Sequence, residues 1–274
     1  MTITARTNAV ANPPLKQRRS IAGLLAPLDK IAATSVNLVA SPGATFDSNG
    51  ERYELPRYLF VGPRGGDAPI RVGVFAGIHG DEPEGVYAMA QLIGLLEARP
   101  ELATGYCLSF YPVCNPTGFE DGTRHSRSGR DLNREFWRNS AEPEVHLLQA
   151  ELASNQFQGI ISLHTDDTSD GFYGYARGAT LTKNLIEPAL TAAEQFLPRN
   201  ELPVIDGFKA RRGVIRDSFE GILAAPPKSR PRPFEIILET PATPPNYLKE
   251  LALVAALQSI LSEYRQFIAY APNL

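Results

Sequence analysis

Apolar and polar positions recur along this chain with two periods, and the change between them marks most of the expected elements. Helical spacing runs over residues 21–33, 83–96, 143–155, 180–196 and 247–268. Strand-like patterns cover residues 35–39, 58–61, 70–76, 106–113, 159–163 and 234–238, separated by turns rich in Pro, Gly and Asn-Gly. Strands that alternate with helices predict an α/β fold, with a mixed, largely parallel sheet covered on both faces.

The segments between these elements define the organisation of the chain. Residues 1–20 are polar and predict a flexible N-terminal arm. Residues 114–130 form a long polar loop, and residues 209–233 are basic and rich in proline. A long loop within a compact domain is usually functional. No internal repeat and no linker composition divides residues 21–274, so one catalytic domain is expected there.

Composition and charge exclude several classes of protein. The chain has 274 residues, of which 43% are hydrophobic, and a net charge of -3, so no nucleic-acid partner is expected. No apolar run reaches the roughly 18 residues that span a membrane. Cys107 and Cys114 lie on one strand-like run and are expected to be free thiols.

The N-terminus bears on the expected location. Arg18-Arg19 followed by an apolar stretch is partly similar to a twin-arginine export signal. Pro27, Asp29 and Lys30 end that stretch early, which favours a short surface helix and a cytoplasmic protein.

Candidate chemistry gathers where three strands end. His79 and Glu82 follow the strand over residues 70–76, His164 ends the strand over 159–163, and Glu239 ends the strand over 234–238. In open α/β sheets, sites form beyond the carboxyl ends of the strands. Two imidazoles and a carboxylate are a catalytic zinc set that leaves a position for water. We therefore expect His79, Glu82 and His164 to bind one Zn2+, with Glu239 as the group that takes the proton of the water.

The loop before residue 135 supplies anion-binding groups. Residues 124–134 contain four arginines, Arg124, Arg127, Arg130 and Arg134. Guanidinium groups bind carboxylates through paired hydrogen bonds, and one close to zinc stabilises an oxyanion. Asn133-Arg134 is expected to bind a substrate carboxylate. Arg127 either joins the substrate site or is a solvated loop residue, and the same two interpretations are open for Arg130.

Other polar residues have alternative interpretations. Asp81 and Glu84 compete with Glu82 as ligands, although the three-residue spacing favours Glu82. His125 is expected on the loop surface and His146 on a helix face.

Two further groups are open to a structural or a functional interpretation. Asp166 and Asp167 either orient a ligand imidazole or form a surface turn. A basic run is expected to be solvated, and would favour an acidic substrate if it lined the pocket: Lys209, Arg211, Arg212 and Arg216.

Five motifs occur in a fixed order: His79-Gly-Asp-Glu82, Asn115-Pro-Thr-Gly-Phe119, Asp131-Leu-Asn-Arg134, Ser162-Leu-His164 and Ile237-Leu-Glu239. Together they resemble the zinc carboxypeptidase superfamily, which includes murein peptide amidase A and the succinylglutamate desuccinylase/aspartoacylase branch. The resemblance covers roughly residues 58–268. It implies a three-layer α/β/α sandwich around a mixed, largely parallel eight-stranded sheet.

The resemblance also implies the role of each site residue. His79, Glu82 and His164 match the zinc ligands, and Glu239 matches the general base. Arg124 matches the arginine that polarises the carbonyl. Asn133 and Arg134 match the pair that binds a terminal carboxylate.

Two departures from the superfamily pattern guide the choice of function. No tyrosine occurs between Tyr175 and Glu239, where carboxypeptidases carry a mobile one. Aspartoacylases add a C-terminal β domain, whereas here one helix follows Glu239, which favours the carboxypeptidase and murein-amidase side. The expected function is zinc-dependent hydrolysis of an amide bond beside a free carboxylate in a small peptide. The alternatives are an N-acyl amino acid deacylase and, in another class, a binding protein on a hydrolase scaffold.

Overall fold

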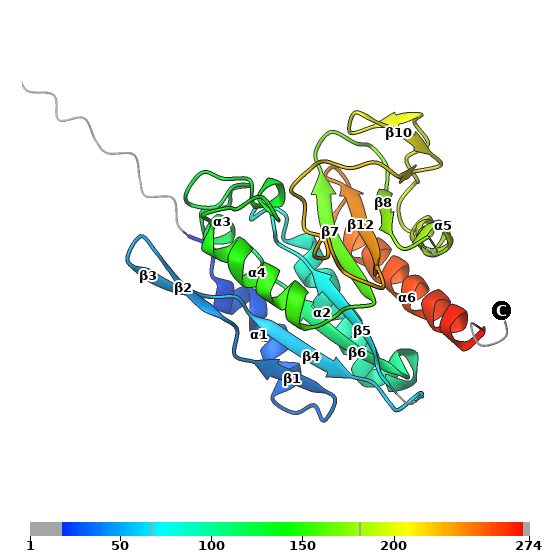
Figure 1. Cartoon of the computed structure of the whole chain (residues 1–274), viewed down its shortest axis with the longest axis horizontal. Helices are drawn as coiled ribbons and strands as arrows, with labels where there is room; N and C mark the ends of the chain where they lie inside the picture. The colour runs from blue at the N-terminus through cyan, green and yellow to red at the C-terminus, as the bar shows by residue number, and fades with distance from the viewer. Residues whose placement is uncertain (1–17, 67, 181, 271–274) are drawn as a thin grey trace, which may run out of the picture.

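A ten-stranded sheet runs through the protein in the computed structural model, which describes residues 18–66, 68–180 and 182–270 (Figure 1). The strand order is β1-β4-β6-β5-β7-β12-β8-β11-β10-β9. The bounds are β1 (Leu38–Ser41), β4 (Arg57–Val61), β5 (Ile70–Phe75), β6 (Tyr106–Tyr111), β7 (Gly159–Asp166), β8 (Tyr173–Gly178), β9 (Val204–Ile205), β10 (Phe208–Arg211), β11 (Val214–Ile215) and β12 (Phe234–Pro241). A separate hairpin, β2 (Thr45–Ser48) and β3 (Glu51–Glu54), turns at Asn49-Gly50.

The centre of the sheet is parallel and its flanks are mixed. Neighbouring strands run parallel from β6 through β5 and β7 to β12, while β4 and β8 join this group antiparallel. The mixed, largely parallel centre is confirmed. The implied count of eight strands is wrong, because β8 and the short strands β9, β10 and β11 extend the sheet beyond β12.

Helices cover both faces of the sheet, as expected of an α/β fold. One apolar core contains residues of α1 (Ile21–Ala32), α2 (Glu84–Ala98), α5 (Thr182–Ala193) and α6 (Asn246–Tyr270). A second core lies under α4 (Pro143–Ser154), where Val145, Leu148 and Leu152 pack with Phe75 and Ile160. Figure 1 shows α4 on the opposite side of the sheet from α2 and α6.

Two expected loops contain regular structure. The segment over residues 114–130 includes α3 (Pro116–Asp121), because Asn115 caps its N-terminus by accepting a hydrogen bond from the amide of Gly118. Short 3-10 turns are η1 (Pro100–Ala103) and η2 (Leu132–Arg134). The basic segment over residues 209–233 includes most of β10 and all of β11.

The remaining structural expectations have mixed outcomes. Cys107 is partly buried, Cys114 is buried, and both are free thiols as predicted. Most of the expected N-terminal arm, residues 1–17, lies outside the described residues, while Ser20 caps α1. Within the described ranges, no helix is both long and apolar enough to cross a membrane.

Candidate metal and substrate site

The turn between β5 and α2 carries His79 and Glu82 into the interior, where both are buried. The backbone at Gly80 lies against the backbone of Gly118 in α3. A Cβ at Gly80 would meet the carbonyl carbon of Gly118 at 2.0 Å, so only glycine fits. This close approach of two backbones holds the turn that presents both side chains.

His164 and Glu239 come from neighbouring strands in register. Strands β7 and β12 are parallel and pair His164 with Glu239. Both strands extend beyond the expected ends at residues 163 and 238, to Asp166 and Pro241, so these two side chains project from within the strands. Paired positions on parallel neighbours face the same side of a sheet. The chain therefore places His164 and Glu239 side by side.

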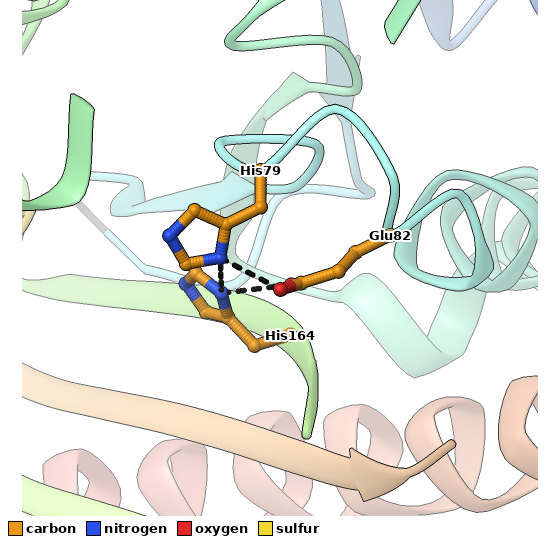
Figure 2. Close-up of side chains that lie close together, drawn as sticks. All are labelled: His79, Glu82 and His164. Carbon is orange, nitrogen blue, oxygen red and sulfur yellow. Dashed lines mark hydrogen bonds and ion pairs between the residues drawn. The ribbon is translucent and has the colours of Figure 1, made fainter. Parts of the chain in front are cut away.

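The side chains of His79, Glu82 and His164 converge on one point (Figure 2). Nδ1 of His79 lies 2.7 Å from Oε1 of Glu82, and Nδ1 of His164 lies 3.0 Å from Oε2. One ligand atom from each residue lies within 4.8 Å of the others, a spacing that can hold one metal ion. Two imidazole nitrogens and a carboxylate are a donor set that fits Zn2+.

The outer nitrogen of each imidazole has its own partner. Nε2 of His79 lies 3.2 Å from Oδ1 of Asp131, and Nε2 of His164 lies 3.0 Å from Oγ of Ser162. Such contacts fix the orientation of a ligand imidazole. Asp131 and Ser162 were not among the candidates from sequence, although Asp131 begins the motif that ends in Arg134.

Asp166 and Asp167 do not orient these imidazoles. Asp166 accepts hydrogen bonds from Thr168 and from the hydroxyl of Tyr173, the latter at 2.9 Å. Asp167 is exposed, and both aspartates line the cavity beside the site. The functional interpretation as imidazole partners is therefore wrong.

Charges within the site offset the cost of burial. Burial raises the pKa of Glu82, but the charges of His79 and His164 outweigh it and hold that pKa far below its usual range. Burial likewise opposes ionisation of Asp131, and its hydrogen bond to His79 together with Arg124 and Arg134 depresses its pKa.

The surroundings of Glu239 raise its pKa, whereas those of Glu82 and Asp131 lower theirs. Burial, followed by the nearby carboxylates of Glu82, Asp166 and Asp206, raises the pKa of Glu239 well above its usual value. None of the described residues donates a hydrogen bond to its carboxylate, which faces the cavity. The oxygens of such a carboxylate are free to accept a proton from a water or from a substrate.

Three of the predicted polar residues of the loop reach the cavity. The guanidinium of Arg124 lies 3.4 Å from Glu82 and 3.2 Å from Asp131. That of Arg134 stacks over the ring of Phe219, 4.1 Å from its centroid. The Oδ1 atom of Asn133 accepts a hydrogen bond from the amide of Leu223 at 2.8 Å, which turns its NH2 group away from that amide.

Arg127 does not reach the cavity, so its predicted place among the substrate-binding residues is wrong. Its guanidinium forms ion pairs with Asp121 at 2.9 Å, Glu120 at 3.1 Å and Glu51 at 3.0 Å. It also lies over the ring of Tyr53. Arg127 therefore fastens the β2–β3 hairpin to α3.

The structure also distinguishes Glu82 from the two other acidic residues that were candidates for the ligand position. Glu84 forms a buried ion pair with Lys249 at 2.6 Å, and Asp81 is exposed, so Glu82 is the acid that joins the two histidines. His125 and His146 are exposed, as predicted.

The basic run is exposed and lies outside the cavity lining: Lys209, Arg211, Arg212 and Arg216.

A cavity of about 470 Å³ opens beside His79, Glu82 and His164. Its lining includes Glu239, Arg124, Asn133 and Arg134. Seven carboxylates and three cationic side chains contribute to its wall: Asp81, Glu82, Glu84, Asp166, Asp167, Asp206 and Glu239, with Arg124, Arg134 and Lys249.

Solved structures with the same fold are metallopeptidases and metallocarboxypeptidases by name. A candidate metallopeptidase from Shewanella denitrificans matches with a TM-score of 0.74 and 24% identity, over 89% of this chain and 90% of that one. A metallo-carboxypeptidase from Burkholderia cenocepacia matches with a TM-score of 0.67 and 15% identity, over 91% and 70%. One from Pseudomonas aeruginosa, in complex with (2-guanidinoethylmercapto)succinic acid, matches with a TM-score of 0.62 and 18% identity, over 88% and 68%.

The fold is shared with these metallopeptidases and metallocarboxypeptidases, in line with the superfamily resemblance of the ordered motifs. Residues 69–204 match the family model of the succinylglutamate desuccinylase/aspartoacylase catalytic domain. No curated protein matches the sequence.

Proposed function

We propose that this protein is a zinc-dependent hydrolase that cleaves an amide bond beside a free carboxylate in a small peptide. The observation that carries the proposal is the convergence of His79, Glu82 and His164 beside a cavity that also contains Glu239 and Arg134. The superfamily match supports hydrolysis as the reaction class.

The three convergent side chains are the proposed metal ligands. Zn2+ held there would lower the pKa of a water and polarise the amide carbonyl. Asp131 and Ser162 keep the two imidazoles turned so that Nδ1 faces the ligand position.

Glu239 is the proposed proton acceptor. Its register beside His164 brings it next to the ligands without being one of them. It accepts a proton from the attacking water and passes it to the leaving nitrogen. A raised pKa favours this second transfer, because the protonated carboxyl is then a competent acid near neutral pH.

Three residues of the loop are proposed to orient the substrate. Arg124, beside Glu82, donates to the carbonyl oxygen as negative charge develops on it. Arg134 and the NH2 group of Asn133 bind the free carboxylate, in line with the stacked, partly buried position of the arginine.

A deacylase is the second candidate, and the family match over residues 69–204 favours it. In that case the same groups would cleave the acyl amide of an N-acyl amino acid. The two candidates share the metal site and differ in what lies on the acyl side of the bond.

Metal analysis is the first test. It also tests the alternative that this chain is a binding protein without a catalytic metal. We expect about one Zn2+ per chain in the purified protein and its loss in His79→Ala. His146→Ala, which alters an exposed histidine, is the matched control and keeps the metal. Absence of zinc from both the parent and the control contradicts the proposal.

Substrate assays separate the two enzyme candidates. Zinc-loaded protein is assayed with N-acetylated dipeptides and with N-acetylaspartate and N-succinylglutamate. Higher kcat/KM for the dipeptides supports the peptidase, and higher kcat/KM for the acylated amino acids replaces it with the deacylase. Glu239→Gln is expected to keep zinc and lose more than about 100-fold in kcat.

A further inference from the structure

A second cavity, of about 770 Å³, lies at the opposite end of the sheet from the proposed metal site. Ile160 and Phe234, near the amino ends of β7 and β12, form part of its wall. His164 and Glu239 lie toward the carboxyl ends of the same two strands. The loop over residues 225–233 and the end of α4 complete the wall. Cavities of this size hold small organic ligands, and the proposed reaction gives this one no role.

The buried part of this lining is apolar. Phe157, Phe234 and Tyr264 are all buried, and the rings of the last two meet edge to face with their centroids 4.7 Å apart. Leu152 and Ile160 add aliphatic surface. A ligand that covers these side chains gains affinity by burying an apolar body of its own.

The exposed part of the lining is cationic. Lys228, Arg230 and Arg232 contribute to the wall, and all three are exposed. Among the residues that the structure describes, none forms an ion pair with these cations, and no aspartate or glutamate lines this cavity. The cavity beside the proposed metal site has seven carboxylates in its wall by contrast. The second cavity therefore attracts negative charge, although the whole chain has a net charge of -3.

The loop that carries these cations is held in place. At its start, the amide of Ala225 donates to the carboxylate of Glu235 at 3.0 Å. At its end, the carbonyl of Pro233 accepts a hydrogen bond from the amide of Ala179 at 2.9 Å. Its backbone is further restricted by four prolines in eight residues: Pro226, Pro227, Pro231 and Pro233. A wall fixed in advance loses little entropy when a ligand binds.

From the apolar lining, the unpaired cations and the fixed loop, we propose that this cavity binds a small amphipathic organic anion. Its carboxylate or phosphate group pairs with the cations of the loop, and its apolar body packs against the three buried rings. The site is separate from the proposed reaction, because none of these residues lines the cavity beside the metal site. A merely solvated basic face would not select for an apolar body.

Calorimetric titration of the full-length protein tests the binding. Octanoate and octyl phosphate carry the two head groups on one tail, 1-octanol lacks the charge, and acetate and inorganic phosphate lack the tail. We expect at least one of the octyl anions to bind about tenfold or more tightly than 1-octanol and than its tail-less counterpart. The tighter of the two identifies the head group. Equal affinity for 1-octanol, or for the tail-less anions, overturns the inference.

Removal of the loop cations tests their role. Lys228→Ala combined with Arg230→Ala and Arg232→Ala is expected to weaken binding of the octyl anion about tenfold or more. The matched control removes three other exposed cations, outside both cavities, and is expected to stay within about twofold of the parent: Lys209→Ala, Arg211→Ala and Arg216→Ala. Equal weakening in both triple variants assigns the effect to net charge and overturns the inference.

Two single variants locate the bound anion. Ala153→Trp places a large ring at an exposed position in the wall of the second cavity, and we expect it to weaken binding about tenfold or more. Arg134→Ala removes a guanidinium from the other cavity, and we expect affinity within about twofold of the parent. Binding that is lost in Arg134→Ala and kept in Ala153→Trp would place the anion beside the metal site and overturn the inference.

Discussion

Nδ1 of His79 and Nδ1 of His164 face each other at 3.2 Å, with the carboxylate of Glu82 beside both. Two imidazole nitrogens at this distance need a proton or a cation between them, because their lone pairs otherwise repel. The protein sets up this opposition by occupying both outer nitrogens, with Asp131 on one ring and Ser162 on the other.

Asp131→Asn therefore tests whether the outer contact supports the metal site. The amide is nearly the same size as the carboxylate but lacks its charge, so it orients His79 less strongly. We expect zinc affinity to fall by about 10- to 100-fold. Competition with a chelator of known affinity measures the change. Asp170→Asn serves as the exposed control, and unchanged affinity in Asp131→Asn would show that the contact is incidental.

The sequence was sufficient to predict that the proposed ligands lie together, because their positions follow a simple rule about strand ends. His79 and Glu82 lie on one strand-to-helix turn, and His164 and Glu239 lie near the carboxyl ends of buried apolar strands, which parallel pairing brings together. Periodicity also located the central strands and the long helices, because their apolar residues recur at regular spacing along the sequence.

What the sequence did not provide depends on contacts between distant segments. Asp131 lies 52 positions from His79, and nothing in its own motif indicates that contact. Arg127 looks like Arg124 in sequence, and its ion pairs with Asp121 and Glu120 of α3 and with Glu51 of the hairpin hold it outside the cavity. The strands β9 and β11 have two residues each, too few for a period-two pattern to be recognised.

Glu239 should make the metal-free protein less stable as the pH rises. Its pKa in the folded protein is raised above the value of about 4.3 in an unfolded chain. Below pH 4 the group is protonated in both states and contributes nothing to the difference. Above it the unfolded chain ionises freely while the folded protein resists, so folding becomes costlier.

Glu239→Gln removes that cost. With zinc stripped by a chelator, the variant is expected to exceed the parent in free energy of unfolding by at least about 1 kcal/mol at pH 7. Near pH 4 the two should coincide. Urea denaturation at both pH values measures the difference, with Glu201→Gln as an exposed control. An equal advantage at pH 4 and pH 7 would attribute the effect to packing instead.

The buried pair of Glu84 and Lys249 predicts a large loss of stability when one partner is removed. Nζ of Lys249 lies 2.6 Å from Oε1 of Glu84, and both residues are buried. Lys249→Met leaves a buried carboxylate whose remaining partner is Thr165. We expect the free energy of unfolding to fall by about 3–5 kcal/mol.

The double variant Glu84→Gln with Lys249→Met is the internal control for this pair. It removes both charges, so most of the lost stability should return. Urea denaturation at neutral pH gives both values. A double variant as unstable as Lys249→Met alone would mean that the methylene stem of the lysine, rather than its charge, is what the core requires.

Arg127 provides the converse case, a loop arginine whose effect should be structural. It bonds Asp121 and Glu120 on α3 and Glu51 on β3, so Arg127→Ala unfastens the hairpin and leaves three carboxylates near one another. We expect the free energy of unfolding to fall by about 1–3 kcal/mol, with zinc affinity within about twofold of the parent. Arg130→Ala, which alters an arginine side chain that is 66% exposed, should change neither quantity. A KM for peptide substrates raised more than about tenfold in Arg127→Ala, at parental stability, would instead return this residue to the substrate site.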